Sequence, residues 1–193
     1  MTLSKILSIV FLLGALGLGY RLYLGVDEVV EEEKMLQRTE ARIIEKLEML
    51  RDAQIAYIGT NGEYASSWDE LKEFIEDGQI YIVQRTETTE LLEYGKEETT
   101  VTIDTLGSVG VQDSLFNETK YPDFNLDLLN VVPGSGGKTF EFFADKIERS
   151  NRELAVFEIR DPAPINPERR RNNNEKALRV GSRTDSSTSG NWE

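Results

Sequence analysis

The sequence predicts an α+β protein in which an N-terminal transmembrane helix is continuous with a long amphipathic helix, followed by a small antiparallel β-sheet domain. Three observations support this fold class. Ile6–Tyr20 is apolar or small throughout. Apolar residues then recur at helical spacing from Val29 to Tyr57. After Gly78 the chain divides into short segments with the alternating pattern of strands.

The N-terminal apolar segment is long enough to cross a membrane if it includes residues on both sides of Arg21. The uninterrupted run of 15 residues is short for a span and has the size of a signal-peptide core. If the Arg21 side chain extends to the membrane surface, Ile6–Val26 supplies 21 residues, which suffices. Ala15-Leu16-Gly17 offers a cleavage site, but helical periodicity resumes at once, which favours an uncleaved span at residues 1–26.

The charges on either side of this segment predict its orientation. Lys5 precedes it, and acidic residues crowd the chain after Asp27. By the positive-inside rule, the N-terminus is cytoplasmic and the C-terminal domain is exported. We therefore expect a single-pass protein of the inner (cytoplasmic) membrane with a periplasmic domain.

Residues 27–58 have the pattern of an amphipathic stalk helix. One apolar face repeats every seven residues, but polar Glu33, Glu40 and Gln54 stand where a coiled coil needs a second apolar position. The pattern favours a helix that packs its lower half onto a domain. The residues of the repeating face are Val29, Leu36, Ile43, Leu50 and Tyr57.

A row of cations recurs every four residues on the other side of this helix, at Lys34, Arg38, Arg42 and Lys46. Such a row is most often a solvated face with glutamate neighbours. An acidic partner or lipid headgroups are the alternative.

The end of the helix carries the most specific residues of the chain. Arg51–Tyr57 leads to Gly59 and Asn61-Gly62, which supply the backbone freedom to end a helix. Tyr64 follows, and Ser67 with Glu70 forms a capping box that opens a second helix.

These residues, with Ala65–Leu71, resemble the end of the long first helix of type IV pilin-like proteins and type II secretion pseudopilins. The resemblance covers about residues 6–75 and implies a membrane helix, a continuous amphipathic helix and an antiparallel sheet. The chain lacks the family's basic prepilin leader ending in glycine, and it lacks the intramembrane Glu of the mature helix. We therefore expect its N-terminal helix to be a permanent anchor and not that of a processed filament subunit.

The exported head domain, residues 59–160, is expected to contain several short strands. We expect a helical turn at Thr86–Tyr94, ended by Gly95, and a turn at Gly107-Ser108, and we expect Ser150-Asn151-Arg152 to close a hairpin. The expected strands are Ile80–Arg85, Thr99–Thr105, Thr139–Ala144, Leu154–Arg160 and Leu178–Ser182.

Residues 161–193 read as a basic loop and a polar C-terminal tail. Asp161–Glu175 contains three prolines, an asparagine triplet and Arg169-Arg170-Arg171. The arginines either lie on a solvated loop or dock on an acidic partner, such as a neighbouring copy. Asp185–Gly190 is expected to be mobile and Trp192 to pack onto the domain.

Composition excludes several classes of function. The chain has 193 residues, a formal net charge of −13, and no histidine or cysteine. Nucleic acid is therefore not an expected partner, because phosphate binding needs cationic surface. Zinc sites built on His or Cys and Ser-His-Asp or Cys-His catalysis are impossible.

No motif nominates a catalytic, cofactor-binding or metal-binding residue. Pro133–Thr139 ends in Gly-Lys-Thr but has Val132 where a phosphate-binding loop needs glycine. Asp123, Asp127 and Asp145 are scattered, and nothing assigns two of them as acid and base. Asn117-Glu118-Thr119 is a glycosylation sequon, meaningful only in a eukaryotic secretory context.

The sequence thus predicts a non-enzymatic, single-pass membrane-anchored structural or assembly protein of the cell envelope, without cofactors. Its expected partners are the lipid bilayer and other envelope proteins or copies of itself. Two alternatives remain open. One is a processed pseudopilin or minor pilin subunit, and the other is a carboxylate-based hydrolase or sugar-binding module.

Overall fold

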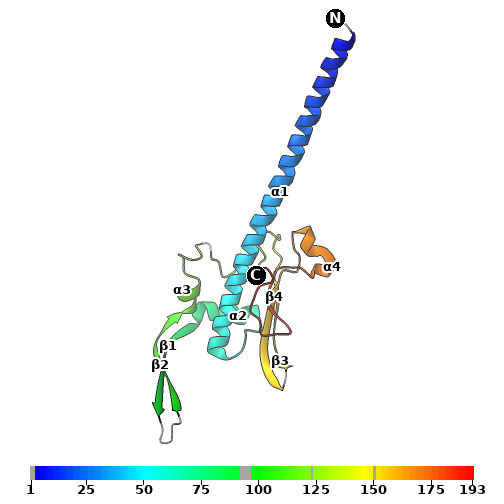
Figure 1. The fold of residues 1–193 in the computed structure, drawn as a ribbon. Coiled ribbons are helices and arrows are strands. Elements are labelled where there is room, and N and C mark those ends of the chain that lie inside the picture. Colours follow the sequence, from blue (N-terminus) through cyan, green and yellow to red (C-terminus); the bar gives the residue numbers. More distant parts are fainter. Residues whose placement is uncertain (1–2, 92–96, 123, 150) are drawn as a thin grey trace. The chain divides into compact units, whose positions relative to one another are not determined.

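The computed structural model describes residues 3–91, 97–122, 124–149 and 151–193 (Figure 1). Its helices and two small antiparallel sheets confirm the predicted α+β class. The elements in chain order are α1 (Leu3–Asn61), α2 (Trp68–Asp77), β1 (Gln79–Leu91), β2 (Glu97–Gly110), α3 (Val111–Leu115), β3 (Glu141–Arg149), β4 (Arg152–Arg160), η1 (Pro167–Arg170), α4 (Arg171–Asn174) and β5 (Arg179–Ser182).

The chain forms two compact units, an N-terminal unit, Met1–Arg42, and a head unit, Ile43–Glu193. The boundaries expected after residues 26, 58 and 160 stay predictions. The C-terminal part of α1 packs inside the head unit, and β5, from the predicted tail, pairs with β4. The contacts therefore place the lower stalk, the head and the tail together.

The C-terminal part of α1 supplies one wall of the head core. Ile43, Leu47, Leu50 and Ala53 are at most 1% exposed and fall on one helix face. This confirms the prediction that the lower half of the amphipathic helix packs onto a domain. Further along, the ring of Tyr57 meets Phe74 of α2 edge-to-face at 5.0 Å.

The turn from α1 to α2 follows the predicted chemistry with small changes. Gly62 adopts φ +79° and its N–H donates to the Ile58 carbonyl at 2.8 Å, so α1 ends three residues later than expected. The Ser67 hydroxyl accepts the Glu70 N–H at 3.3 Å, as a capping box requires. The Glu70 carboxylate reaches the Ser66 N–H at 2.8 Å, one residue earlier than the standard box.

Helix α2, which the capping box predicted, buries Leu71, Phe74 and Ile75. It ends at Gly78, whose N–H donates to the Phe74 carbonyl at 2.9 Å. Leu71, Phe74 and Ile75 belong to the same core cluster as the face of α1 described above.

Strands β1 and β2 form a long two-stranded antiparallel hairpin that departs from the prediction. The helical turn expected at Thr86–Tyr94 is wrong as far as Leu91, because β1 continues through these β-branched residues. Tyr94 and Gly95 lie outside the described residues. The turn expected at Gly107-Ser108 is also wrong, because both residues belong to β2 and the register shifts there at a bulge.

The second sheet has the order β3-β4-β5 and is antiparallel throughout. The hairpin predicted between β3 and β4 is confirmed, because Arg149 pairs with Arg152. Asn151 adopts φ +63° in its turn, and Ser150 lies outside the described residues. The predicted last strand is confirmed as β5. Thr139, expected to open β3, instead forms an isolated bridge with Val131.

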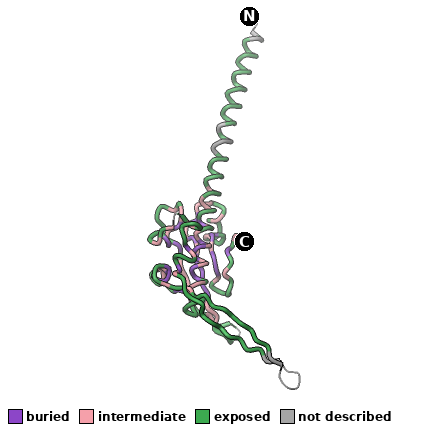
Figure 2. The backbone as a smooth tube through the Cα atoms, turned by 90° about the vertical axis from the view of Figure 1, so that its left-hand side faces the viewer, coloured by how far each residue is buried: buried purple, intermediate pink, exposed green. Residues whose placement is uncertain are grey.

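The core of the head unit lies between α1, α2 and the β3-β4-β5 sheet, where Figure 2 shows the buried segments. Its sheet residues include Phe157, Ile159 and Val180, each at most 1% exposed. The hairpin, by contrast, is exposed along almost all of its described length in Figure 2.

The C-terminal segment packs onto this core. Trp192 contacts it, as predicted, and Gly190 is buried and bridges to Val180. The Arg51 guanidinium also binds the Glu193 carboxylate at 2.6 Å. Backbone bridges and Trp192 therefore join the last residues to the head unit.

Candidate functional site

The N-terminal unit presents one candidate membrane segment. Ile6–Tyr23 has a mean hydropathy of 1.8, and none of it is buried. Exposed fractions of its large apolar side chains run from 45% at Ile9 to 78% at Phe11. Among the described residues, it is the one helix long and apolar enough to cross a membrane, and a signal sequence has the same properties.

The orientation of this segment in a membrane stays a prediction, because it rests on charges that flank the segment in the sequence. The side chains of Lys5, Val26 and Asp27 lie outside the described residues.

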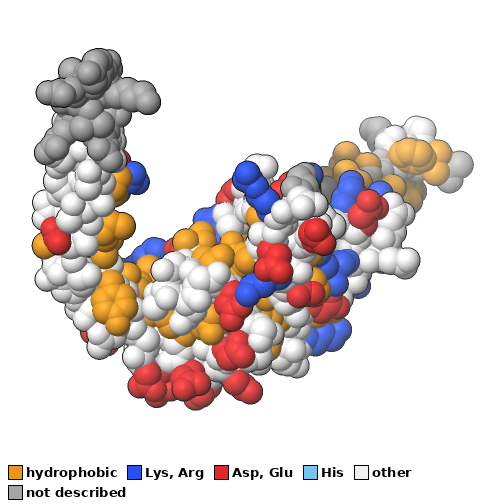
Figure 3. Space-filling view, turned by 90° about the horizontal axis from the view of Figure 1, so that it is seen from below, with side chains coloured by type: hydrophobic (Ala, Val, Ile, Leu, Met, Phe, Trp, Pro, Cys, Tyr) orange, Lys and Arg blue, Asp and Glu red, His pale blue; other side chains and the backbone are white. Residues whose placement is uncertain are grey.

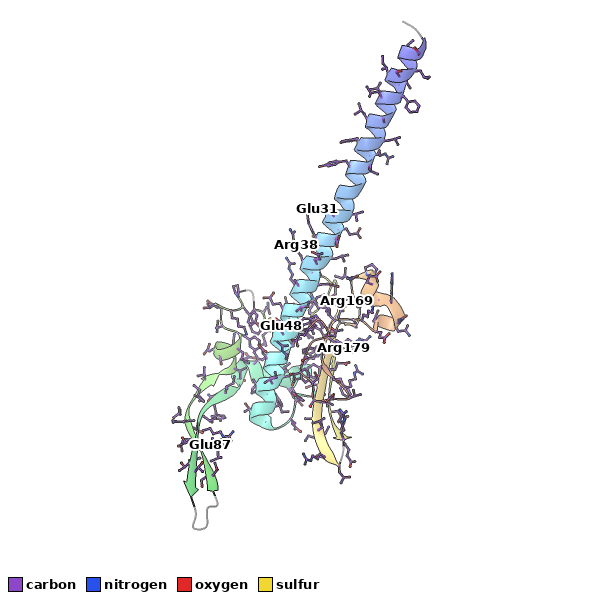
Figure 4. All side chains as sticks on the ribbon, in the orientation of Figure 1. Glu31, Arg38, Glu48, Glu87, Arg169 and Arg179 are labelled. Carbon is purple, nitrogen blue, oxygen red and sulfur yellow. The ribbon has the colours of Figure 1, made fainter. Side chains whose placement is uncertain are left out.

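Within the row of cations, Lys34 pairs with Glu31 at 3.0 Å and both are more than half exposed. This pair fits the expected solvated face, and Figure 4 shows Glu31 and Arg38 on the same helix.

Lys46 departs from that solvated face. Its amino group donates to the Leu128 carbonyl, and Lys72 of α2 donates to the neighbouring Asp127 carbonyl at 3.2 Å. Burial, and then the charge of Lys72, lowers the pKa of Lys46. The two lysines thus join both helices to one turn. The position of Lys46 beside Ile43 and Leu47 is the signal that sequence reasoning missed.

The head unit contains an open cavity of about 290 Å³, here called the tyrosine cleft. It is formed by the end of α1, the loop to α2 and the β3–β4 hairpin. The residues that line it are Tyr57, Glu63, Tyr64, Ser66, Glu70, Ala144, Asp145, Lys146 and Ala155. A second hollow shares Tyr57 and Glu70 and adds Glu73. Acids and tyrosines therefore surround the end of α1.

Most charges of the tyrosine cleft already have partners. Glu63 and Lys146 form an ion pair at 2.7 Å. The hydrogen bond from Lys146 lowers the pKa of Glu63, and the same bond raises the pKa of Lys146. Glu70 accepts the Ser66 N–H, and Asp145 accepts the Lys146 N–H at 2.8 Å. Glu63 is thus not poised to donate a proton, and the Glu70 carboxylate is held by the backbone of Ser66.

The two tyrosines complete the cleft as neutral groups. Burial raises the pKa of Tyr57, with further contributions from Glu70, Glu63 and Glu73, and burial raises the pKa of Tyr64. Both phenols therefore stay protonated at neutral pH and can donate hydrogen bonds. The cleft therefore presents phenol donors beside carboxylate acceptors.

The aspartates weighed from the sequence do not converge. Asp145 lines the tyrosine cleft, whereas Asp127 lies in the turn that receives Lys72 and is not part of the lining. Asp123 lies outside the described residues. In the described part of the chain, no three acidic side chains gather as a metal site.

Pro133–Thr139 is a tight turn and not a phosphate-binding loop. The Val132 N–H donates to the Lys138 carbonyl at 2.8 Å, and the Ser135 hydroxyl accepts the Lys138 N–H at 3.0 Å. Strand β3 follows, where a phosphate loop needs a helix.

The arginine triplet supports its own loop. Arg169 donates to the Lys176 carbonyl, Arg170 to the Pro164 carbonyl, and Arg171 pairs with Glu168 at 2.6 Å. Figure 4 labels Arg169 in this segment. These bonds favour a structural role over a free basic patch, because each guanidinium makes an internal contact.

Comparison with family models, with curated proteins and with solved structures finds no match to this chain. The resemblance to pilin-like proteins therefore stays a prediction.

Proposed function

We propose that the chain is a non-enzymatic, single-pass membrane protein whose head unit serves as a subunit or scaffold of a cell-envelope assembly. The observation that carries this proposal is Ile6–Tyr23, an apolar helical segment of which nothing is buried. Large apolar side chains left in water are unfavourable, and a bilayer is the medium that accepts a helix apolar on all sides.

In this proposal α1 is continuous, so that the anchor and the head share one helix. The support is that α1 extends from Leu3 to Asn61 without an internal proline. The N-terminus is placed in the cytoplasm and the head in the periplasm, supported by Lys5 before the segment and acids after it.

Phase partitioning of the full-length chain tests the anchor. The native protein should enter the detergent phase. Leu12→Arg with Leu13→Arg should move it to the aqueous phase, because each central arginine costs about 2.5–3.5 kcal/mol on insertion scales. Glu32→Arg, which adds charge outside the apolar segment, is the control. Equal partitioning of all three proteins contradicts the proposal.

The first residue of the mature protein distinguishes a processed pilin subunit from a permanent anchor. A mature protein that starts near residue 18 or 20 contradicts a permanent anchor and favours processing, whereas an intact N-terminus contradicts processing.

A second candidate function rests on the tyrosine cleft. Its volume lies near the lower end for small-ligand sites, and tyrosines beside carboxylates suit the hydroxyl groups of a sugar. Because Glu63 and Glu70 already have partners, the cleft supports binding and not hydrolysis.

Titration with N-acetylglucosamine and glucose oligosaccharides, followed by tyrosine fluorescence, tests the sugar-binding candidate. Saturable binding should be lost in Tyr64→Ala and kept in Tyr81→Ala, which changes a tyrosine of the distant hairpin. No saturable signal with either sugar series contradicts this function.

A further inference from the structure

The outer edge of β1 is open along a long and exposed strand. Within the described residues, β2 is the only strand that pairs with β1, and the two form a sheet by themselves. All residues from Tyr81 to Thr89 are exposed. An isolated two-stranded hairpin is marginally stable, and its unpaired N–H and C=O groups are a template for a further strand.

β1 carries charged side chains but lacks the other features that usually protect such an edge. It contains no proline, glycine or lysine. The bulge lies in the other strand, because Ile82 pairs with Gly107 and Val83 with Thr105, which leaves Leu106 without a partner. The regular edge of the hairpin is therefore β1, and the edge of β2 is interrupted.

One face of the hairpin combines exposed apolar residues with one pair of opposite charges. Cross-strand partners share a face, so the register places Val83, Arg85 and Glu87 of β1 beside Ile103 and Val101 of β2. Val83, Ile103 and Val101 are 52%, 64% and 44% exposed. The opposite face carries threonines with Gln84 and Asp104. Figure 3 shows apolar side chains along one side of this projecting arm, which ends in grey.

The charges of β1 are complementary to a second copy of the same strand. Arg85 and Glu87 lie on the same face on either side of Thr86 and pair with each other at 2.7 Å in one chain, both more than half exposed. Glu87 is labelled on the hairpin in Figure 4. If two β1 strands run antiparallel about a twofold axis at Thr86, each Arg85 faces the Glu87 of the other copy. Both pairs are attractive, and Val83 faces Thr89.

We propose that a second copy of this chain pairs with β1 edge to edge in this register. The two hairpins then form one four-stranded antiparallel sheet whose apolar faces are continuous. This proposal names a partner for the assembly role, and it rests on that proposed function only for the membrane setting. The pairing itself needs nothing outside the hairpin.

Cysteine cross-linking of the full-length protein in detergent tests the register directly, because the chain has no cysteine. Residues directly opposite across antiparallel strands have Cα atoms about 4.5–5.5 Å apart, within the range of about 4.4–6.8 Å that a disulfide spans. Thr86→Cys should therefore give a covalent dimer on mild oxidation.

Two matched controls define the edge and the register. Thr102 pairs with Thr86 but lies on β2, so Thr102→Cys should stay monomeric. In Thr88→Cys the two cysteines would be offset by four residues, about 13 Å along the strand, which is too far for a disulfide. A monomeric Thr86→Cys protein, or equal cross-linking of all three variants, overturns the proposal.

Charge exchange supplies an independent readout. Arg85→Glu places two like-charge pairs in the interface and should weaken dimerisation at least about fivefold, and Glu87→Arg should do the same. The double variant Arg85→Glu with Glu87→Arg should recover the native affinity, measured by the native mass of detergent-solubilised protein against concentration. Unchanged affinity in both single variants contradicts the pairing.

Recovery of the protein in the membrane or in the aqueous phase distinguishes a failure of the β1 pairing from a failure of the membrane anchor. Failure to cross-link in protein that stays with the membrane contradicts the pairing alone. Cross-linking in protein that stays in the aqueous phase supports the pairing and contradicts the anchor.

Discussion

Replacing Gln54 by alanine should lower the free energy of unfolding of the head unit by about 3 kcal/mol. Gln54 is fully buried in α1, and its side-chain amide binds the backbone of Ala65 in both directions. Its Nε2 donates to the Ala65 carbonyl at 3.2 Å, and its Oε1 accepts the Ala65 N–H at 3.0 Å. This pair of bonds fixes the turn between α1 and α2.

The magnitude follows from what the substitution leaves behind. Two neutral hydrogen bonds contribute about 1 kcal/mol each, and an unpaired buried backbone group costs about 1–3 kcal/mol. Ala65 is itself fully buried, so water does not reach its N–H and carbonyl in the folded state. A loss of about 3 kcal/mol is a large part of the stability of a typical domain.

Gln54→Glu gives a sharper form of the same test. It keeps the acceptor and the shape, but it loses the donor and buries a carboxylate beside the Ala65 carbonyl. We expect a loss at neutral pH at least as large as for alanine. The loss should shrink in acid, because a protonated carboxyl regains a donor.

Urea denaturation of the full-length protein in detergent, followed by tryptophan fluorescence, measures these effects, since Trp68 and Trp192 both pack on the head core. Gln112→Ala, at an exposed position of α3, is the control and should change stability by less than about 0.5 kcal/mol. If Gln54→Ala costs no more than this control, the assignment of the Gln54–Ala65 bonds as a stabilising link is wrong.

Three further predictions concern the cap, a strained glycine and a buried acid. Ser67→Ala should cost about 1 kcal/mol in the same denaturation assay by removing the N-cap of α2, and no loss would contradict the capping assignment. Gly181→Ala should cost clearly more than Gly136→Ala. Both positions have positive φ, but only at Gly181 would a Cβ meet the Phe157 carbonyl oxygen, at 2.2 Å, and equal losses would contradict this packing. Burial raises the pKa of Asp161 above its ordinary 3.8, so its contribution to stability is full below pH 3.8 and is lost as pH rises through the folded-state pKa. Asp161→Asn should remove that fall from the pH dependence of unfolding, and an unchanged profile would contradict the assignment.

Much of the fold could be predicted because local chemistry agrees with tertiary packing. The apolar stripe of α1, the Ser67 cap and the β3–β4 hairpin each have a signal within a few residues. The error at Thr86–Leu91 has a physical cause. The β-branched threonines of this segment favour a strand, and the pairing with β2 that stabilises it lies outside any local pattern.

The candidate site could be predicted only in part. Tyr57 and Tyr64 were identified as residues at a helix end, but their cleft also needs Asp145 and Lys146 from β3. Contacts between residues so far apart in the chain depend on sheet register, which no local pattern specifies. The hydrogen bond of Lys46 could not be predicted for a similar reason, since its acceptor is the carbonyl of Leu128, which is far away in the chain.

The permanent membrane anchor is best tested by the intact mass of the full-length protein recovered from alkali-washed membranes of the producing cells. We expect the protein to stay in the membrane pellet with its N-terminal segment, Ile6–Tyr23, still attached. Recovery in the wash, or a mature chain that begins near residue 18 or 20, would contradict it.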